Sequence, residues 1–363
     1  MGTRFSCMPS NNKKSIRNSS RRMTKPLRTS SNRYSSDTKA SRLEEELLWL
    51  YQQHMRLERS SSMRQPAQAS KQRVSRSASA RARQSSDPIV QPLQLLKKEG
   101  TALNAYTKHI VLVHGGGFGA WCWYKLVASL EEEGFIVHAL DLTGSGIDST
   151  DPNDISTIEL YVEPLTAYME SVSEADKVML VGHDFGGVCI SFVMEKFPQK
   201  IAKSVFVSAT MVTNGQSASD IFSAEVLTSD DLLQNSQVFI YKHGKNQSPT
   251  SIELKRDALK ELLFNQSPAK DIALASLSIR PMPFAPVVEK LSLTPENYGT
   301  VPRYYIETTE DRALTMAVQQ RMIKVNPPNK VYRLKGSDHS PFLSKPQALL
   351  KLLLEISQIK PTV

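Results

Sequence analysis

Lys177-Val-Met-Leu-Val-Gly-His-Asp-Phe-Gly-Gly187 is the stretch of this 363-residue chain that decides its fold. Its first five residues form a short apolar run of the kind that becomes a buried parallel strand. A helical run then extends from Val188 to Phe197 and is stopped by Pro198. The glycines between the two elements let the backbone and the helix approach each other closely. The local order is therefore strand, Gly-x-Asp-x-Gly turn, helix.

This order predicts a nucleophile elbow, the strained turn that presents the catalytic residue in the α/β-hydrolase fold. The residue at the tip of such a turn is usually serine, and here it is Asp184. The pattern therefore indicates the fold strongly, whereas the chemistry that it predicts is unusual.

The chain around the elbow alternates strand-like and helix-like segments. We expect strands over 109–113, 135–140, 204–208, 303–307 and 331–334, and helices over 158–171, 314–325 and 346–359. Between Met211 and Tyr298 the alternation gives way to a helical, proline-punctuated insertion, which we interpret as a cap. Repeated βα units with right-handed crossovers predict a mostly parallel sheet with helices on both faces.

The charge of the chain is divided unevenly along its length. The first 100 residues hold 21 Lys and Arg against 7 Asp and Glu, which leaves 24 basic and 29 acidic residues in the remainder. Such an Arg- and Ser-rich segment cannot bury enough apolar surface to offset the entropy lost on ordering. We therefore predict a disordered basic region over residues 1–105 and one α/β-hydrolase domain over 106–363, with its cap at about 211–298.

Two segments of the basic region stand out. A capping box at Ser41–Glu44, followed by leucines at helical spacing, predicts a short helix near residues 41–58. The segment 73–83 is rich in Arg and Ser, but no aromatic residues are interleaved with its charges. We interpret it as a solvated linker and expect no nucleic-acid partner.

The N-terminus supports two predictions of localisation. An acid-poor, Arg- and Ser-rich leader is typical of a transit peptide and favours the chloroplast. The alternative is a membrane-anchored cytoplasmic protein, since Gly2 and Ser6 match the myristoylation pattern and Cys7 could carry a second lipid. No run approaches 18 apolar residues, so no transmembrane segment is expected.

Six blocks of the body resemble the plant methylesterase and hydroxynitrile lyase branch of the α/β-hydrolases. In chain order they are Val113-His-Gly-Gly-Gly-Phe-Gly-Ala-Trp-Cys-Trp-Tyr124, Leu140-Asp-Leu-Thr-Gly-Ser-Gly146, Lys177-Val-Met-Leu-Val-Gly-His183, Met194-Glu-Lys-Phe-Pro-Gln-Lys200, Thr309-Glu-Asp-Arg312 and Gly336-Ser-Asp-His-Ser340. The basic extension is similar to that of the plastid-type members. The resemblance implies hydrolysis of methyl esters of small plant signalling acids, such as jasmonate, salicylate or indole-3-acetate.

The resemblance also implies the site residues. Asp184 takes the nucleophile position, Asp311 orients the catalytic histidine, and His339 is that histidine, in the chain order that the fold requires. Glu310 and Asp338 are the alternatives to Asp311. The oxyanion would be bound by the backbone N–H groups of two residues, Gly116 and Phe185.

The rest of the site follows from the same resemblance. His114 and His183 are expected to hydrogen-bond the glycine loops. The pocket should be small and apolar, with walls that include Phe118, Trp121, Phe185 and Phe239. We expect a small apolar ester as the ligand, with no metal and no cofactor. A homodimer is compatible with the sequence.

Aspartate at the nucleophile position leaves three functions open. A carboxylate needs no base to attack, but attack on an ester carbonyl would form a mixed anhydride and expel alkoxide poorly. The first function is ester hydrolysis, with Asp184 as nucleophile or as a base that directs water. The second resembles that of the epoxide hydrolases, with an alkyl-enzyme intermediate on Asp184; leaving-oxygen donors would be sought at Tyr241 and Tyr298. The third is a ligand-binding pseudoenzyme.

Overall fold

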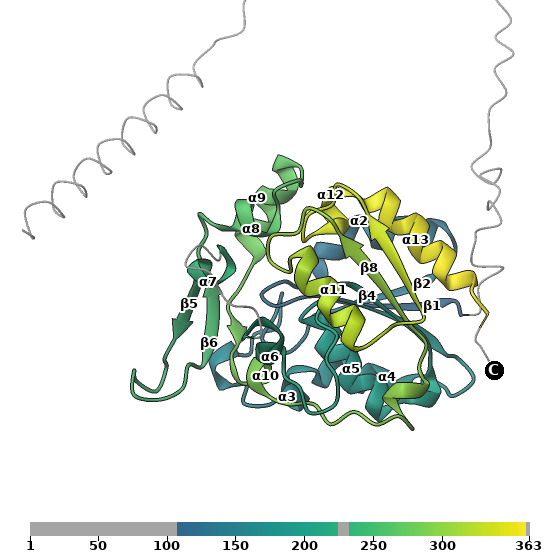
Figure 1. The fold of residues 1–363 in the computed structure, drawn as a ribbon, viewed down its shortest axis with the longest axis horizontal. Coiled ribbons are helices and arrows are strands. Elements are labelled where there is room, and N and C mark those ends of the chain that lie inside the picture. Colours follow the sequence, from purple (N-terminus) through teal and green to yellow (C-terminus); the bar gives the residue numbers. More distant parts are fainter. Residues whose placement is uncertain (1–106, 224–231, 361–363) are drawn as a thin grey trace, which may run out of the picture. The chain divides into compact units, whose positions relative to one another are not determined.

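The computed structural model describes residues 107–223 and 232–360. Its centre is a six-stranded sheet in the order β2-β1-β3-β4-β8-β9, and every pair of neighbouring strands is parallel (Figure 1). The strands are β1 His109–Val113, β2 Ile136–Leu140, β3 Val178–Asp184, β4 Ile201–Ala209, β8 Arg303–Thr308 and β9 Lys330–Leu334. The predicted parallel sheet is therefore confirmed.

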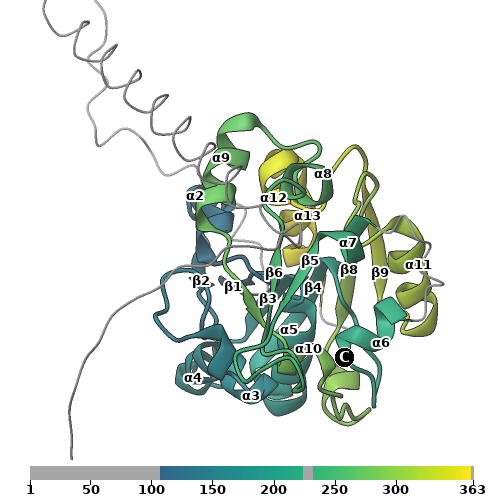
Figure 2. The ribbon, with the colours of Figure 1, turned by 90° about the vertical axis from the view of Figure 1, so that its left-hand side faces the viewer.

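Helices cover both faces of this sheet because successive strand side chains point to opposite sides. In β1, Val111 and Val113 pack into the core with α4, α5 and α11, whereas Ile110 and Leu112 pack into the core with α2, α12 and α13. Figures 1 and 2 show these two groups of helices on either side of the sheet. Their bounds are α2 Tyr124–Glu132, α4 Glu163–Ser171, α5 Gly186–Lys196, α11 Met316–Val325, α12 Pro341–Ser344 and α13 Pro346–Gln358.

The helix predicted over 158–171 is divided into two. It consists of α3, Ile158–Tyr161, and α4, Glu163–Ser171, with one residue between them. Pro164 stands in the first turn of α4, where its missing N–H costs nothing. A proline at that position begins a new helix more readily than it continues an old one.

The interval between β4 and β8, residues 210–302, is called the cap below. It contains helices, as predicted, and also a three-stranded antiparallel sheet in the order β5-β6-β7 that the sequence analysis did not foresee. The cap strands are β5 Gln237–Ile240, β6 Ser251–Leu254 and β7 Met282–Pro283; its helices are α6 Ala218–Ser223, α7 Leu232–Ser236, α8 Leu259–Leu263, α9 Ala269–Ser278 and α10 Ala285–Val288. Strands this short carry little periodic signal, and β7 is distant in sequence from its partner.

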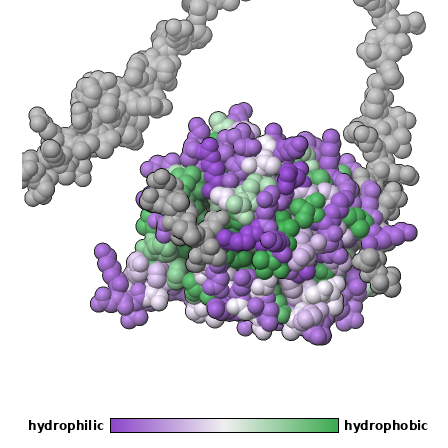
Figure 3. All heavy atoms as spheres, viewed as in Figure 1, coloured by the Kyte–Doolittle hydropathy of each residue, from purple (hydrophilic) through white to green (hydrophobic). Residues whose placement is uncertain are grey.

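The expectations for residues 1–105 lie outside the described residues, including the helix near 41–58 and the roles of Gly2 and Cys7. Among the residues that are described, none of the helices has the length and apolar character needed to cross a bilayer. On the face drawn in Figure 3, hydrophobic residues gather beside β5 and β6, where Val238 and Phe239 are exposed.

Candidate active site

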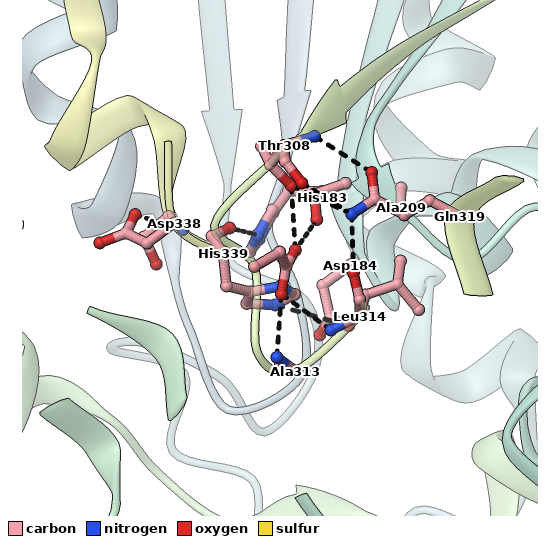
Figure 4. Close-up of polar contacts among 12 residues, drawn as sticks. His183, Asp184, Ala209, Thr308, Ala313, Leu314, Gln319, Asp338 and His339 are labelled. Atoms are coloured by element: carbon pink, nitrogen blue, oxygen red, sulfur yellow. Dashed lines mark hydrogen bonds and ion pairs between the residues drawn. The ribbon is translucent and has the colours of Figure 1, made fainter. Parts of the chain in front are cut away.

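The ends of four parallel strands gather the residues that the sequence singled out. Asp184 ends β3, Gly116 follows β1, Asp311 follows β8 and His339 follows β9. These positions share the carboxyl edge of the sheet, near β1, where the strand order reverses and where open α/β sheets place their ligands. The structure thus brings Asp184, Asp311 and His339 together, and Figure 4 shows Asp184 and His339 in one cluster.

The turn at Asp184 has the geometry of an elbow. Asp184 adopts a φ of 49°, a left-handed conformation that is strained for a residue other than glycine. A Cβ at Gly182 would lie 2.7 Å from the carbonyl oxygen of Gly186, and one at Gly186 would lie 2.6 Å from that of His114. Both glycines are therefore required by close packing, which explains the Gly-x-Asp-x-Gly pattern.

Asp311 holds the His339 ring through Nδ1. The distances from Nδ1 to the two carboxylate oxygens of Asp311 are 2.9 and 3.1 Å. The backbone N–H groups of Ala313 and Leu314 donate to Oδ1 of Asp311 at 2.9 and 2.8 Å. These donors fix the position of the Asp311 carboxyl group, which can therefore orient the imidazole.

Two hydroxyls that the sequence analysis missed complete this arrangement. Ser208 and Thr308 both donate to Oδ2 of Asp311, the latter at 3.0 Å. Ser208 has a φ of 44° and sits where the register between β3 and β4 shifts. The shift places its side chain on Asp311, and no local sequence pattern announces such a bulge.

The two alternatives to Asp311 do not touch the ring of His339. Glu310 is exposed, and its carboxylate accepts a hydrogen bond from Thr309 at 3.2 Å. Asp338 is buried and accepts hydrogen bonds from the N–H groups of Gln266 and Ser340 and from the hydroxyl of Ser267, at 2.9, 3.0 and 2.8 Å. Asp338 therefore ties the segment between α8 and α9 of the cap to the loop that carries His339.

Asp184 lies on the other side of the imidazole and makes a second set of contacts. The N–H of Gly116 donates to Oδ2 of Asp184 at 2.9 Å, and the N–H of Phe185 also donates to this carboxylate. Oδ1 of Asp184 lies 3.8 Å from Nε2 of His339. The side chain of Asp184 is 21% exposed, whereas that of His339 is 1% exposed.

Burial and charge act together on the two groups. Burial by itself lowers the pKa of His339, but the carboxylates of Asp311, Asp184 and Asp338 outweigh it and raise that pKa to about 9. Burial raises the pKa of Asp184, partly offset by His339 and by the two backbone donors. At neutral pH His339 is therefore protonated, with the carboxyl groups of Asp311 and Asp184 on its two sides.

His114 and His183 hold loops, as the sequence analysis expected. Nδ1 of His114 lies 2.8 Å from the carbonyl oxygen of Gly115, and its Nε2 accepts from the N–H of Leu142 at 3.1 Å. Nε2 of His183 donates to the carbonyl oxygen of His339 at 2.7 Å, so it fixes the backbone beside the His339 ring.

A pocket of about 100 Å³ opens onto Asp184 and His339. Most of its wall is apolar, formed by Phe118, Phe185, Ala218, Phe222, Leu233, Ile252, Leu254, Leu263, Ile279, Met282, Val287 and Ala313. Arg280 also lines it, and its Nη1 donates to the carbonyl oxygens of Gly146 and Asp148. No sequence pattern had marked this arginine.

Two of the aromatic residues predicted to form the pocket wall do not line it. Trp121 stacks against Phe118, with 5.8 Å between ring centroids. Phe239 is exposed on β5 and packs edge-on against Phe284. Both aromatics support the neighbours of the pocket instead of facing its ligand space. In the described ranges, no cluster of three or more His, Cys, Asp or Glu side chains could hold a metal ion.

Comparisons with known proteins agree with this geometry. A model of the α/β-hydrolase family matches residues 110–352. The chain is 55% identical over 305 residues to the Arabidopsis thaliana protein named "Putative methylesterase 11, chloroplastic", covering 84% of this chain and 78% of the relative. It is 38% identical to methyl jasmonate esterase 1 of Vitis vinifera, covering 69% and 96%. A crystal structure of an Arabidopsis methylesterase superposes with a TM-score of 0.61 at 33% identity, covering 68% and 98%.

Proposed function

The chain belongs to the α/β-hydrolase family, in its plant methylesterase branch, a group of carboxylic ester hydrolases, and on that premise we propose that it hydrolyses methyl esters of small apolar acids. The observation that carries the proposal is the position of Asp184 and His339 at the wall of a largely apolar pocket, with Asp311 on the far side of the imidazole. Such a pocket accepts an apolar acyl group and presents its ester to the two polar residues.

Esters of jasmonate, salicylate and indole-3-acetate are the substrates that we propose for this pocket. Methyl jasmonate is named for one relative, and all three acids combine an apolar body with one carboxyl group. In this proposal Asp184 is the nucleophile, His339 transfers protons and Asp311 orients it. Gly116 and Phe185 supply the oxyanion donors.

The test is an assay of the purified full-length protein with methyl jasmonate, methyl salicylate and methyl indole-3-acetate. Release of the free acid and of methanol, measured by mass spectrometry, would support the proposal if it is lost in His339→Gln. Glu310→Gln is the matched control, because Glu310 is exposed and does not touch His339. Failure to release acid from any of the three esters at high enzyme concentration would count against methylesterase activity.

Binding without turnover is a second candidate, favoured by one observation. Oδ2 of Asp184 already accepts the Gly116 N–H that a substrate oxyanion would need. A protein of this kind would bind the ester and the free acid in calorimetry while releasing no methanol. The epoxide alternative has weaker support, since neither tyrosine considered for it lines the pocket: Tyr241 is exposed, and the hydroxyl of Tyr298 accepts a hydrogen bond from Asn326 at 3.0 Å.

We also propose that the protein resides in the plastid. The basic leader supports this, and the Arabidopsis relative at 55% identity is named chloroplastic. The leader lies outside the described residues, so this proposal rests on sequence alone.

A further inference from the structure

The two oxygens of the Asp184 carboxylate have different surroundings. Oδ2 accepts a hydrogen bond from the N–H of Gly116 at 2.9 Å, and the N–H of Phe185 also donates to the carboxylate. Oδ1 lies 3.8 Å from Nε2 of His339, too far for a hydrogen bond. Oδ2 is therefore held by a backbone donor, whereas Oδ1 has no hydrogen bond to His339.

The anchored oxygen occupies the position that a substrate oxyanion would need. Attack on an ester carbonyl moves negative charge onto the carbonyl oxygen, and that charge needs donors such as Gly116 and Phe185. Both donors already serve Asp184. Attack by Asp184 on the carbonyl would also produce a mixed anhydride and expel methoxide, a strong base. Two features thus oppose cleavage of the acyl–oxygen bond.

Attack on the methyl carbon of the same ester avoids both difficulties. Displacement at a saturated carbon forms no tetrahedral oxyanion on the substrate carbonyl, because the negative charge leaves with the acid as a delocalised carboxylate, so the occupied donors do not block this step. The leaving group is the carboxylate of the substrate acid, a far weaker base than methoxide. Carboxylate side chains are established covalent nucleophiles in enzymes.

We propose that Oδ1 of Asp184 attacks the methyl carbon of the substrate ester, so that the methyl–oxygen bond breaks and a methyl ester of Asp184 forms. This inference rests on the proposed methylesterase function and assigns the bond that the site cleaves. An electron pair of Oδ1 forms the new carbon–oxygen bond, and the pair of the broken bond leaves with the acid as its carboxylate. No oxidation or reduction is involved.

Methylation prepares His339 for the second step. The Asp184 carboxylate is one of the charges that raise the pKa of His339, and methylation neutralises it. Loss of this charge lowers the pKa of His339, although Asp311 continues to raise it, and so favours release of the imidazolium proton to solvent. The neutral imidazole is the base that the second step requires.

Hydrolysis then takes place at the carboxyl carbon of Asp184. Neutral His339 takes a proton from a water molecule as that water attacks, and the negative charge develops on Oδ2, where the Gly116 donor already points. The tetrahedral species expels the methoxy group, which takes the proton from His339 and leaves as methanol. The remaining carboxyl proton passes to His339 and restores the imidazolium–carboxylate pair. The net reaction is ester plus water to acid plus methanol.

Arg280 is placed to receive the departing carboxylate. It lines the pocket, and its Nη1 is held by the carbonyl oxygens of Gly146 and Asp148. Among the described residues, its Nε and Nη2 make no hydrogen bond. The free donors of an anchored guanidinium suit a carboxylate.

The source of the oxygen in the products tests the proposal directly. The full-length protein would be incubated with a methyl ester in oxygen-18 water, and both products analysed by mass spectrometry. We expect unlabelled acid, because both of its oxygens come from the ester, and methanol whose label grows over turnovers as Asp184 acquires oxygen from water. One labelled oxygen in the acid would overturn the proposal while leaving methylesterase activity intact. Absence of both products would reject the proposed function itself.

A trapping experiment gives an independent readout. His339→Gln removes the base of the second step, so the peptide that contains Asp184 should gain the mass of one methylene group after exposure to the ester. Asp184→Asn is the control and should gain nothing. An unmodified Asp184 in a His339→Gln variant that is folded and binds the free acid would contradict the proposal.

Phenyl esters of the same acids provide a third test. They are more reactive than methyl esters at the carbonyl, but a carboxylate cannot displace at an aromatic carbon. We expect the natural protein to cleave the methyl ester and leave the phenyl ester intact. Faster cleavage of the phenyl ester would indicate attack at the carbonyl and overturn the proposal.

Discussion

Oδ1 of Asp184 lies 3.8 Å from Nε2 of His339, on the opposite side of the imidazole from Asp311. This separation exceeds a hydrogen bond but is short enough for strong attraction between opposite charges in a buried site. Asp311 contributes most to raising the pKa of His339 to about 9 against the cost of burial, and Asp184 adds to it, so His339 is protonated at neutral pH. In a serine hydrolase the corresponding histidine must be neutral before it can take the proton of the serine hydroxyl. Aspartate in place of serine at position 184 therefore changes the order of the proton transfers.

Replacing Asp184 by Ser should increase the rate of methyl ester hydrolysis. The change frees the N–H groups of Gly116 and Phe185 for a substrate oxyanion and removes one of the charges that raise the pKa of His339. A complete nucleophile–base pair is worth several orders of magnitude in rate. The variant should also place oxygen-18 from water in the acid. A folded Asp184→Ser protein no faster than the natural one would show that the pocket does not align an ester for serine.

Replacing Asp311 by Asn should lower the rate of hydrolysis by about 10³- to 10⁴-fold, as expected when a catalytic histidine loses its orienting carboxylate. Asp311 is the carboxylate in contact with Nδ1 of His339. The measurement is kcat for methyl ester hydrolysis, with Glu310→Gln as the control of unchanged rate. An equal loss of kcat in the two variants would show that Asp311 is not the residue that orients His339.

Folding stability should fall as the pH rises from about 6.5 to about 9. A histidine whose pKa is raised by folding contributes stability that is complete below its unfolded pKa and is lost as the pH passes through its folded pKa. The loss should be about 3 kcal/mol at most, since each pKa unit corresponds to about 1.4 kcal/mol. Burial lowers the pKa of Lys203 to about 8, and this acts in the opposite direction above that pH.

The contribution of His339 is therefore best measured as a difference. Urea denaturation of the natural protein and of His339→Gln at several pH values would isolate it, because Lys203 is common to both. Parallel pH profiles for the two proteins would contradict a raised pKa at His339.

Adding one methyl group beside the nucleophile should disturb the site. A Cβ at Gly115 would lie 2.6 Å from Cβ of Asp184 and 2.9 Å from Nδ1 of His183, neither of which can move far. Gly115→Ala should therefore abolish hydrolysis and cost about 1–3 kcal/mol of stability. Gly116→Ala would meet the flexible end of Met282 and should destabilise less. Thermal unfolding of the two variants measures the difference in stability. Equal decreases in the unfolding temperature would refute the predicted difference.

A fluorescent protein fused to the C-terminus should accumulate in plastids. Import would depend on the basic leader, so removal of the first 60 residues should leave the signal in the cytoplasm. A plasma-membrane signal that Gly2→Ala abolishes would instead support the lipid-anchored form.

The parts of the site that sequence predicts are those with a local pattern. The elbow at Asp184 follows from two glycines between an apolar run and a helix, and the residues at 311 and 339 follow strands. Ser208 reaches Asp311 only through an irregularity in strand pairing, and Arg280 reaches the pocket from the cap. Both depend on contacts distant in sequence, which residue patterns do not encode.

Asp338 makes the cap part of the catalytic arrangement. Asp338 directly precedes His339, and its carboxylate accepts hydrogen bonds from the backbone N–H of Gln266 and the hydroxyl of Ser267 in the cap. Separating these segments would remove two of the hydrogen-bond donors of a buried carboxyl group, at a considerable energetic cost. The cap residues that line the pocket are therefore connected mechanically to the loop that carries His339. Exchanging caps between relatives should transfer specificity only when the incoming cap keeps hydrogen-bond donors for Asp338.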